Sequence, residues 1–153
     1  MSTSPTASAG GADLVTRLLD LWSRPLPADD SAALAGFGAL YTDPVDVNGT
    51  SVRLTDMLAR ARAIQGAFSG LERVVLEQVE APGKVVVAFR LVGTHTGPLP
   101  TALGVVPATG GPVDLRVIDV LTLTDGRISG IVMAGDELGN LVRLGAVALA
   151  DTT

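Results

Sequence analysis

The stretch that decides the fold is RVIDVLTLTDGRISGIVMAGDELG, residues 116–139. Asp125-Gly126 lies between two runs of alternating, mostly apolar residues, which is the strongest short-range signal for a hairpin with a two-residue turn. Counting back from that turn places Asp119 opposite Val132. The stretch therefore predicts a long antiparallel hairpin near the C-terminus.

The two faces of this hairpin differ in character, because successive side chains point to opposite sides of a strand. One face carries Leu115, Val117, Asp119, Leu121 and Leu123, with Ile128, Val132, Ala134 and Asp136 opposite. The other face carries polar residues around an apolar centre of Ile118, Val120, Ile131 and Met133. The first face is the better candidate for the interior. It holds two carboxylates, and a buried acid is costly unless it is paired, protonated or used in function.

Composition limits the classes of protein to consider. The 153 residues are 47% hydrophobic and 18% charged, which is typical of one globular domain. The net charge is −5 and no block of Lys or Arg occurs, so a nucleic-acid or anionic-membrane partner is not expected. With no cysteine and a single histidine, His95, we expect no metal site, and we expect no cofactor.

The ends of the chain predict no targeting segment. The first ten residues, MSTSPTASAG, lack a basic start and an apolar stretch, and no apolar run reaches the roughly 18 residues that a membrane span requires. We expect a disordered tail over 1–11, one α+β barrel domain over 12–148 and a tail over 149–153. The expected location is cytoplasmic.

The N-terminal half has helical periodicity. Apolar residues recur at helical spacing over 12–23 and 31–41, and a third helix is predicted from an N-cap at Thr55 to about Phe68. A short strand over 43–49 ends in an Asn-Gly turn.

After Gly70 the period changes to two, which predicts strands over 72–80 and 85–95 joined by a tight turn. One face of the second strand is apolar from Val85 through Phe89 and leads to His95. A Gly- and Pro-rich loop over 96–111 precedes the final hairpin; loops this long often act as lids or binding loops, and a floppy surface loop is the alternative. A short helix follows from Asp136 to about Leu144.

Helices followed by strands indicate an α+β fold. We expect a curved antiparallel sheet with the N-terminal helices packed on its concave face, forming a cone with an internal pocket.

Four motifs in this order carry a resemblance to a known family: GTHTG (93–97), PATGGPV (107–113), the IDV of the hairpin and DELGNLVRLG (136–145). With them the chain resembles the SnoaL-like polyketide cyclases of the nuclear-transport-factor-two-like superfamily. This superfold includes aldol, epoxide-opening and pyran-forming cyclases, epoxide hydrolases, ketosteroid isomerases and ligand-binding proteins. The resemblance also implies a homodimer formed through the outer sheet face, where Ile118, Val120, Ile131 and Met133 are expected.

Site residues of the relatives are carried over one by one. The resemblance places Asp136 where aldol cyclases have an acid–base aspartate, but Thr122 stands where they have a supporting histidine. Pyran-forming and epoxide-opening relatives place an aspartate on the strand that here bears Asp119. The Arg-x-Asp arrangement of the limonene-type epoxide hydrolases is absent, since Asp114-x-Arg116 has the reverse order and the wrong face. Ketosteroid isomerase is discarded, because its DPV motif falls too early and Leu18 replaces its tyrosine.

The candidate site residues follow from these considerations. The catalytic candidates are Asp119, Asp136 and His95; the substrate-binding candidates are Trp22, Tyr41, Asn48, Phe89, Leu91 and Leu121. Five of them have a structural alternative: Asp119 as a core acid bonded to Trp22 or a backbone amide, Asp136 as a helix N-cap, His95 as an anchor for the loop, Asn48 as a turn residue and Trp22 as a core residue.

Three functions remain open. The first is a cofactor-free cyclase that closes a ring in a hydrophobic polyketide or polyene, by acid–base chemistry or by templating a [4+2] closure. The second is an epoxide hydrolase or epoxide-opening cyclase. The third is a non-catalytic ligand-binding or dimerisation domain. Asp119→Asn and Asp136→Asn discriminate between these functions.

Overall fold

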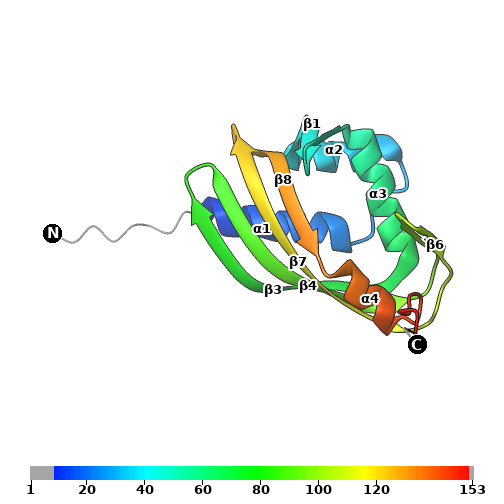
Figure 1. Ribbon diagram of the computed structural model, residues 1–153. Helices are drawn as coiled ribbons and strands as arrows, with labels where there is room; N and C mark the ends of the chain where they lie inside the picture. Colours follow the sequence, from blue (N-terminus) through cyan, green and yellow to red (C-terminus); the bar gives the residue numbers. More distant parts are fainter. Residues whose placement is uncertain (1–8, 152–153) are drawn as a thin grey trace.

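The computed structural model describes residues 9–151 and has the α+β architecture that the sequence predicts. One sheet has the strand order β2-β1-β8-β7-β4-β3. Its strands are β1 (Tyr41–Val47), β2 (Thr50–Val52), β3 (Phe68–Ala81), β4 (Lys84–His95), β7 (Pro112–Thr124) and β8 (Arg127–Gly135). Neighbouring strands are antiparallel except for β1 and β8, which pair in parallel. The sheet is curved but stays open, so the expected barrel does not close (Figure 1).

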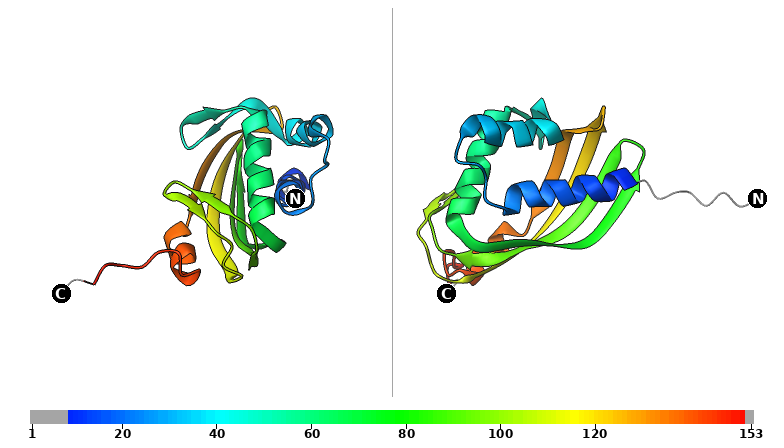
Figure 2. Two further views of the ribbon diagram at one scale, coloured as in Figure 1. Left: turned by 90° about the vertical axis from the view of Figure 1, so that its right-hand side faces the viewer. Right: turned by 180° about the vertical axis from the view of Figure 1, so that it is seen from behind.

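Three helices cover the concave side of this sheet (Figure 2). They are α1 (Ala9–Ser23), α2 (Asp30–Leu40) and α3 (Leu54–Ala67). The short α4 (Glu137–Arg143) follows β8. Helix α1 already includes residues 9–11, which the sequence assigned to a tail; residues 1–8 of that expected tail lie outside the described residues.

The start of α3 differs from the sequence prediction. Thr55 was expected as its N-cap, but the helix begins at Leu54, and Arg53 at the cap position makes no side-chain cap bond. The carboxylate of Asp43 instead accepts the Leu54 N–H at 3.3 Å. A residue of β1, eleven positions earlier in the chain, therefore supplies the cap, which local sequence patterns do not reveal.

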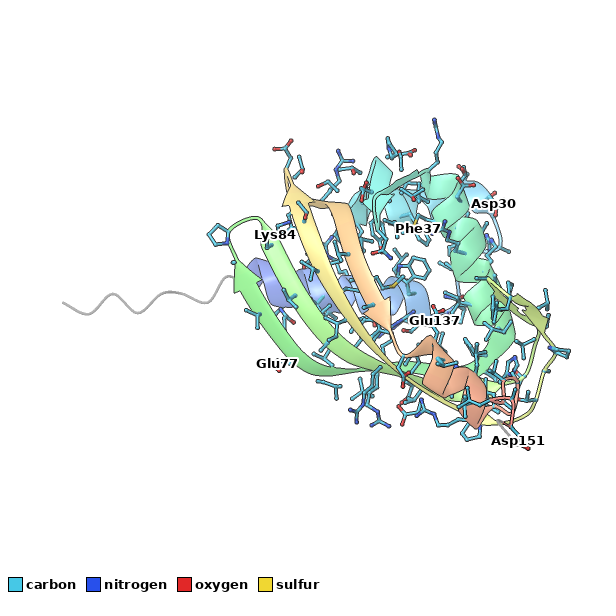
Figure 3. All side chains as sticks on the ribbon, viewed as in Figure 1. Asp30, Phe37, Glu77, Lys84, Glu137 and Asp151 are labelled. Atoms are coloured by element: carbon cyan, nitrogen blue, oxygen red, sulfur yellow. The ribbon has the colours of Figure 1, made fainter. Side chains whose placement is uncertain are left out.

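The β4–β7 ladder forms the floor of the interior. Val85, Val87 and Phe89 of β4 are all buried and face Leu121, Asp119 and Val117 of β7, respectively. Phe37 projects inward from α2 over this floor (Figure 3) and has no exposed surface. The apolar face of β4 is therefore inward, as predicted.

A β-bulge corrects the predicted register of the final hairpin. The pairs next to the turn are as expected, but the pairing of β7 with β8 shifts by one residue between Thr122 and Leu123. Asp119 therefore faces Met133, not Val132. Because a shift of one residue exchanges the faces, Ile131 is buried inside and Val132 is 63% exposed on the outer face.

A second bulge lies in β3, between Val75 and Glu77. Counting back from the β3–β4 turn without it would place Arg73 opposite Val92 on the outer face. With the bulge, Arg73 pairs with Leu91, whose side chain points inward. The bulge thus brings a charged residue to the concave side.

The predicted loop over 96–111 contains two short strands, β5 (Leu99–Thr101) and β6 (Gly104–Val106), which pair with each other. This arm lies beside α3 (Figure 1). The backbone N–H groups of Thr96 and Gly97 both donate to the carbonyl of Ala67 at 3.0 Å. A Cβ at position 97 would meet the Gly66 carbonyl, so the base of the arm is packed tightly against the end of α3.

Candidate functional site

The space between the helices and the floor holds a cavity of about 150 Å³, which we call the inner chamber. Its walls are mostly apolar and come from α1, α3, β1, β3, β4, β7 and β8. The polar side chains that reach it are Trp22, Tyr41, Arg60, Arg73 and Asp119. A dry cavity of this size accepts a ligand as large as benzene.

A second cavity, of about 750 Å³, opens beyond it and is called the outer chamber. It lies between α3, the β5–β6 arm and α4, over Leu91 and Leu115 of the sheet. Arg60 and Ile64 of α3 line both chambers. The two chambers therefore adjoin along α3 and together suit an elongated, largely apolar ligand.

Asp119 is the carboxylate of the inner chamber. It is only 8% exposed, and its Oδ1 has no hydrogen-bond partner within residues 9–151. Burial raises the pKa of Asp119 from its ordinary 3.8 to about 6, an effect that the charge of Arg73 partly offsets. The alternative of a core acid bonded to Trp22 does not hold, because the Trp22 Nε1 donates elsewhere.

The Trp22 indole donates its hydrogen bond to the Tyr41 hydroxyl at 2.7 Å. Tyr41 is buried and stacks on Phe37 with a ring-centroid distance of 6.0 Å. Burial raises the pKa of Tyr41 far above its usual value, and the Asp119 charge adds to this shift. The Tyr41 hydroxyl therefore stays protonated. Because Trp22 only donates, the hydroxyl hydrogen remains free for an acceptor in the chamber.

Arg73 is the site residue that the sequence analysis missed. Its Nη1 donates to Ser23 Oγ at 3.0 Å, and the guanidinium lies 6.0 Å and 5.8 Å from the ring centroids of Trp22 and Phe89. Burial lowers the pKa of Arg73 to about 10, so it is still charged at neutral pH. Only the β3 bulge brings it inside, and a bulge leaves no clear signal in a single sequence.

His95 lies outside both chambers. It is fully buried in a second apolar cluster, where its ring is 5.9 Å from that of Phe68. Its Nδ1 is 3.0 Å from Thr109 Oγ1 and accepts the Thr109 backbone N–H at 3.3 Å. These contacts join the two ends of the segment that carries the β5–β6 arm. His95 therefore anchors the loop, which is the structural alternative for this residue.

Asp136 also lies outside the lining of both chambers. The strand β8 ends at Gly135, and Asp136 is the exposed N-cap of α4, where its Oδ1 accepts the Gly139 N–H at 3.0 Å. The expectation that Asp136 faces the interior opposite Leu115 is therefore wrong, because the strand ends before it.

The remaining candidates divide between the chambers and the core. Phe89 lines the inner chamber with Trp22 and Tyr41, and Leu91 lines the outer chamber. Leu121 has no exposed surface and lines neither chamber. Asn48 also lines neither chamber. Its Oδ1 accepts the Met133 N–H at 2.8 Å, and its Nδ2 donates to the Met133 carbonyl.

Within residues 9–151, no group of three or more His, Cys, Asp and Glu side chains is placed to hold a metal ion. No helix among these residues is long and apolar enough to cross a membrane.

An open α+β sheet with helices over an apolar, ligand-sized cavity defines a small-molecule-binding or catalytic domain. The family model of the SnoaL-like polyketide cyclases matches residues 12–142, and the chain belongs to this family.

Solved structures share the fold over nearly the whole chain. A protein of Jannaschia sp. CCS1 described as a SnoaL-like polyketide cyclase is 25% identical, with a TM-score of 0.74 over 97% of this chain and 99% of its own. TsrD of Streptomyces laurentii is 20% identical, with a TM-score of 0.76 over 92% and 98%. IdmH of Streptomyces antibioticus is 20% identical, with a TM-score of 0.68 over 88% and 98%. No curated protein matches the chain in sequence.

The raised pKa of Asp119 predicts a pH-dependent stability. Because the folded-state pKa is about 6 and the ordinary value 3.8, the native protein binds more protons than the unfolded chain between these values, and stability falls as the pH rises through them. Asp119→Asn removes the free-energy cost of burying the ionised carboxylate. We expect the variant to match the wild type below about pH 4 and to exceed it by about 3 kcal/mol near pH 8.

Urea unfolding of both proteins from pH 4 to pH 8 measures this difference. A stability gain that is independent of pH, or a loss near pH 8, would contradict the assignment of Asp119 as a buried, unpaired carboxylate.

Proposed function

We propose that this protein closes a ring in a hydrophobic polyketide intermediate without a cofactor, with Asp119 as the proton-transferring group. The observation that supports this proposal is the Asp119 carboxylate, which is unpaired at Oδ1 within the described chain and buried in an apolar, ligand-sized cavity. Such a group is expensive to maintain unless it acts on a ligand.

The neighbours of Asp119 suit the generation of an enolate. With a pKa of about 6, Asp119 is ionised in most of the molecules at neutral pH, and the carboxylate can act as a base. It takes a proton from the carbon next to a substrate carbonyl, while the Tyr41 hydroxyl donates a hydrogen bond to the carbonyl oxygen. The enolate carbon then attacks a second carbonyl carbon of the same substrate molecule; the π bond of that carbonyl breaks, and its oxygen takes the proton from Asp119 to become a hydroxyl.

The other polar group near the carboxylate, Arg73, tunes the base. Its charge favours the ionised form of Asp119 and so keeps the pKa of the carboxyl from rising further. Arg73 itself is held by Ser23 and by the two aromatic rings beneath it. Because the bulge in β3 brings Arg73 to this position, acid–base catalysis by Asp119 depends on that bulge.

A templated [4+2] closure is the alternative within the same function. The inner chamber has few polar groups, and holding the two reactive ends of a polyene together would lower the barrier by several kcal/mol without proton transfer. In that case Asp119 only polarises the substrate.

Asp119→Asn separates these two modes. For proton transfer we expect kcat/KM to fall by about 10²–10⁴-fold, the usual contribution of a positioned acid or base. The wild-type rate should rise with pH through about 6, the pKa of Asp119. The assay follows ring closure of a series of linear polyketide thioesters of increasing chain length.

Asp136→Asn is the matched control, because asparagine caps a helix as well as aspartate does and Asp136 lies outside both chambers. Its turnover should equal that of the wild type. A loss of less than about threefold in Asp119→Asn, with a flat pH profile, would favour templating. Ligand binding without turnover in the wild type would favour a binding module.

Epoxide opening is the second candidate, because the fold places Arg73 and Asp119, from separate strands, in the same chamber. The local Asp114–Arg116 pair cannot serve, since Asp114 forms an ion pair with Arg90 on the outer face, at 2.7 Å. Incubation with terpene and polyether epoxides tests this candidate, and the absence of diol or ether products excludes it.

We also propose that the outer sheet face mediates a homodimer. Its apolar residues differ from the expected set, because Ile131 is buried and Met133 lines the inner chamber. Ile118 and Val132 are 51% and 63% exposed, and Val74 and Val79 of β3 extend the same face. Patches of this kind commonly mark an interface.

Sedimentation velocity checks the dimer. The wild type should sediment as a dimer and Ile118→Glu as a monomer, because the new charge would be buried unpaired in the interface. Leu149→Glu, the same kind of change at a 90% exposed position near the C-terminus, is the control and should stay dimeric. A monomeric wild type would contradict the proposal.

A further inference from the structure

Asn140 of α4 is a buried amide that the proposed chemistry does not use. It is 4% exposed, and its Oδ1 has no hydrogen-bond partner in the described chain, residues 9–151. An unsatisfied buried polar group costs about 1–3 kcal/mol, whereas an apolar side chain of similar size would not. The fold itself therefore gains little from an asparagine here.

The same side chain lines the outer chamber. Most of the chamber's other walls are apolar, and they include Phe68, Leu91, Leu115 and Leu141. A carboxamide carries both an acceptor oxygen and N–H donors, so it can bind a hydroxyl or a carbonyl. A ligand in this chamber would thus meet a neutral hydrogen-bonding group on a largely apolar surface.

A ligand that occupies both chambers must extend along β7. Leu115 of the outer chamber and Asp119 of the inner chamber lie on the same face of β7, four residues apart in the sequence. At ~3.3 Å per residue this separation is roughly 13 Å. Arg60 and Ile64 of α3 line both chambers, so the chambers adjoin at these two side chains.

We infer that the outer chamber is a second substrate subsite in which Asn140 selects for an oxygen function remote from the reacting carbonyl. The substrate class is an elongated polyketide whose reacting carbonyl is bound at Tyr41 and Asp119 and whose remote hydroxyl or ketone reaches Asn140 in the outer chamber. This inference rests on the proposed function, because it assumes that the inner chamber holds the carbonyl.

Three ketone probes test it by isothermal titration calorimetry: methyl hexyl ketone, methyl undecyl ketone and the undecyl ketone with a terminal hydroxyl. In the wild type the long ketone should bind more tightly than the short one. The hydroxylated ketone should bind about 3- to 10-fold more tightly than the plain long ketone, which is the net effect of one hydrogen bond.

Asn140→Leu should abolish the preference for the hydroxyl and leave the affinity for the plain long ketone unchanged. Its melting temperature should equal or exceed that of the wild type, because an unsatisfied amide is replaced by an apolar group. Ala102→Phe, on the arm that lines the outer chamber, should weaken both long ketones and leave the short one unaffected. Tyr41→Phe should weaken all three probes alike.

Other results would overturn the inference. These are a hydroxyl preference that persists in Asn140→Leu, a lower melting temperature for that variant, or equal affinity for the short and long ketones. Tyr41→Phe could leave the affinity of all three probes unchanged while Asn140→Leu still abolishes the preference for the hydroxyl. In that case the carbonyl does not bind in the inner chamber, and the proposed function fails instead. Failure of the wild type to bind any probe contradicts both.

Discussion

The site depends on the strict alternation of side chains along the β4–β7 ladder. Val117 and Leu121 must face the helices to form the core, so Asp119 between them must face the same way. The chain cannot relieve the burial of this carboxylate without turning the whole apolar row outward. Desolvation therefore raises the pKa of Asp119, and the charge of Arg73 limits the rise.

The two bulges decide what surrounds that carboxylate. The bulge in β8 turns Ile131 inward and Val132 outward, and the bulge in β3 turns Arg73 toward the cavity. Each inserts one residue and so exchanges the faces of the strand beyond it. The inner chamber thus combines Asp119, the proposed base, with the Tyr41 hydroxyl and apolar walls. These groups come from separate strands and helices.

The sequence predicted those features that depend on local periodicity. The α+β class, the inward face of β4 and the inward direction of Asp119 follow from alternation and from one turn signal. Arg73, Asn140 and the cap of α3 by Asp43 could not be predicted, because each depends on register shifts or on contacts between distant segments. Asp136 was misplaced because β8 ends at Gly135 and Asp136 caps α4, and the alternation of a hairpin does not show where its strand ends.

In the proposed cyclase, the two chambers would separate reaction from recognition. The inner chamber is small and holds the ionisable groups, and the larger outer chamber can accept the rest of an extended chain. The specificity of such a protein would then reside in α4 and the β5–β6 arm, while its chemistry resides on the sheet.

The most direct test of this account is a titration of the Asp119 carboxyl carbon by ¹³C NMR, with Asp119→Asn used to assign the signal. The burial of Asp119 beside Arg73 predicts a midpoint at about pH 6. A midpoint near the ordinary value of about 3.9 would show a solvated or paired carboxylate and would contradict the account.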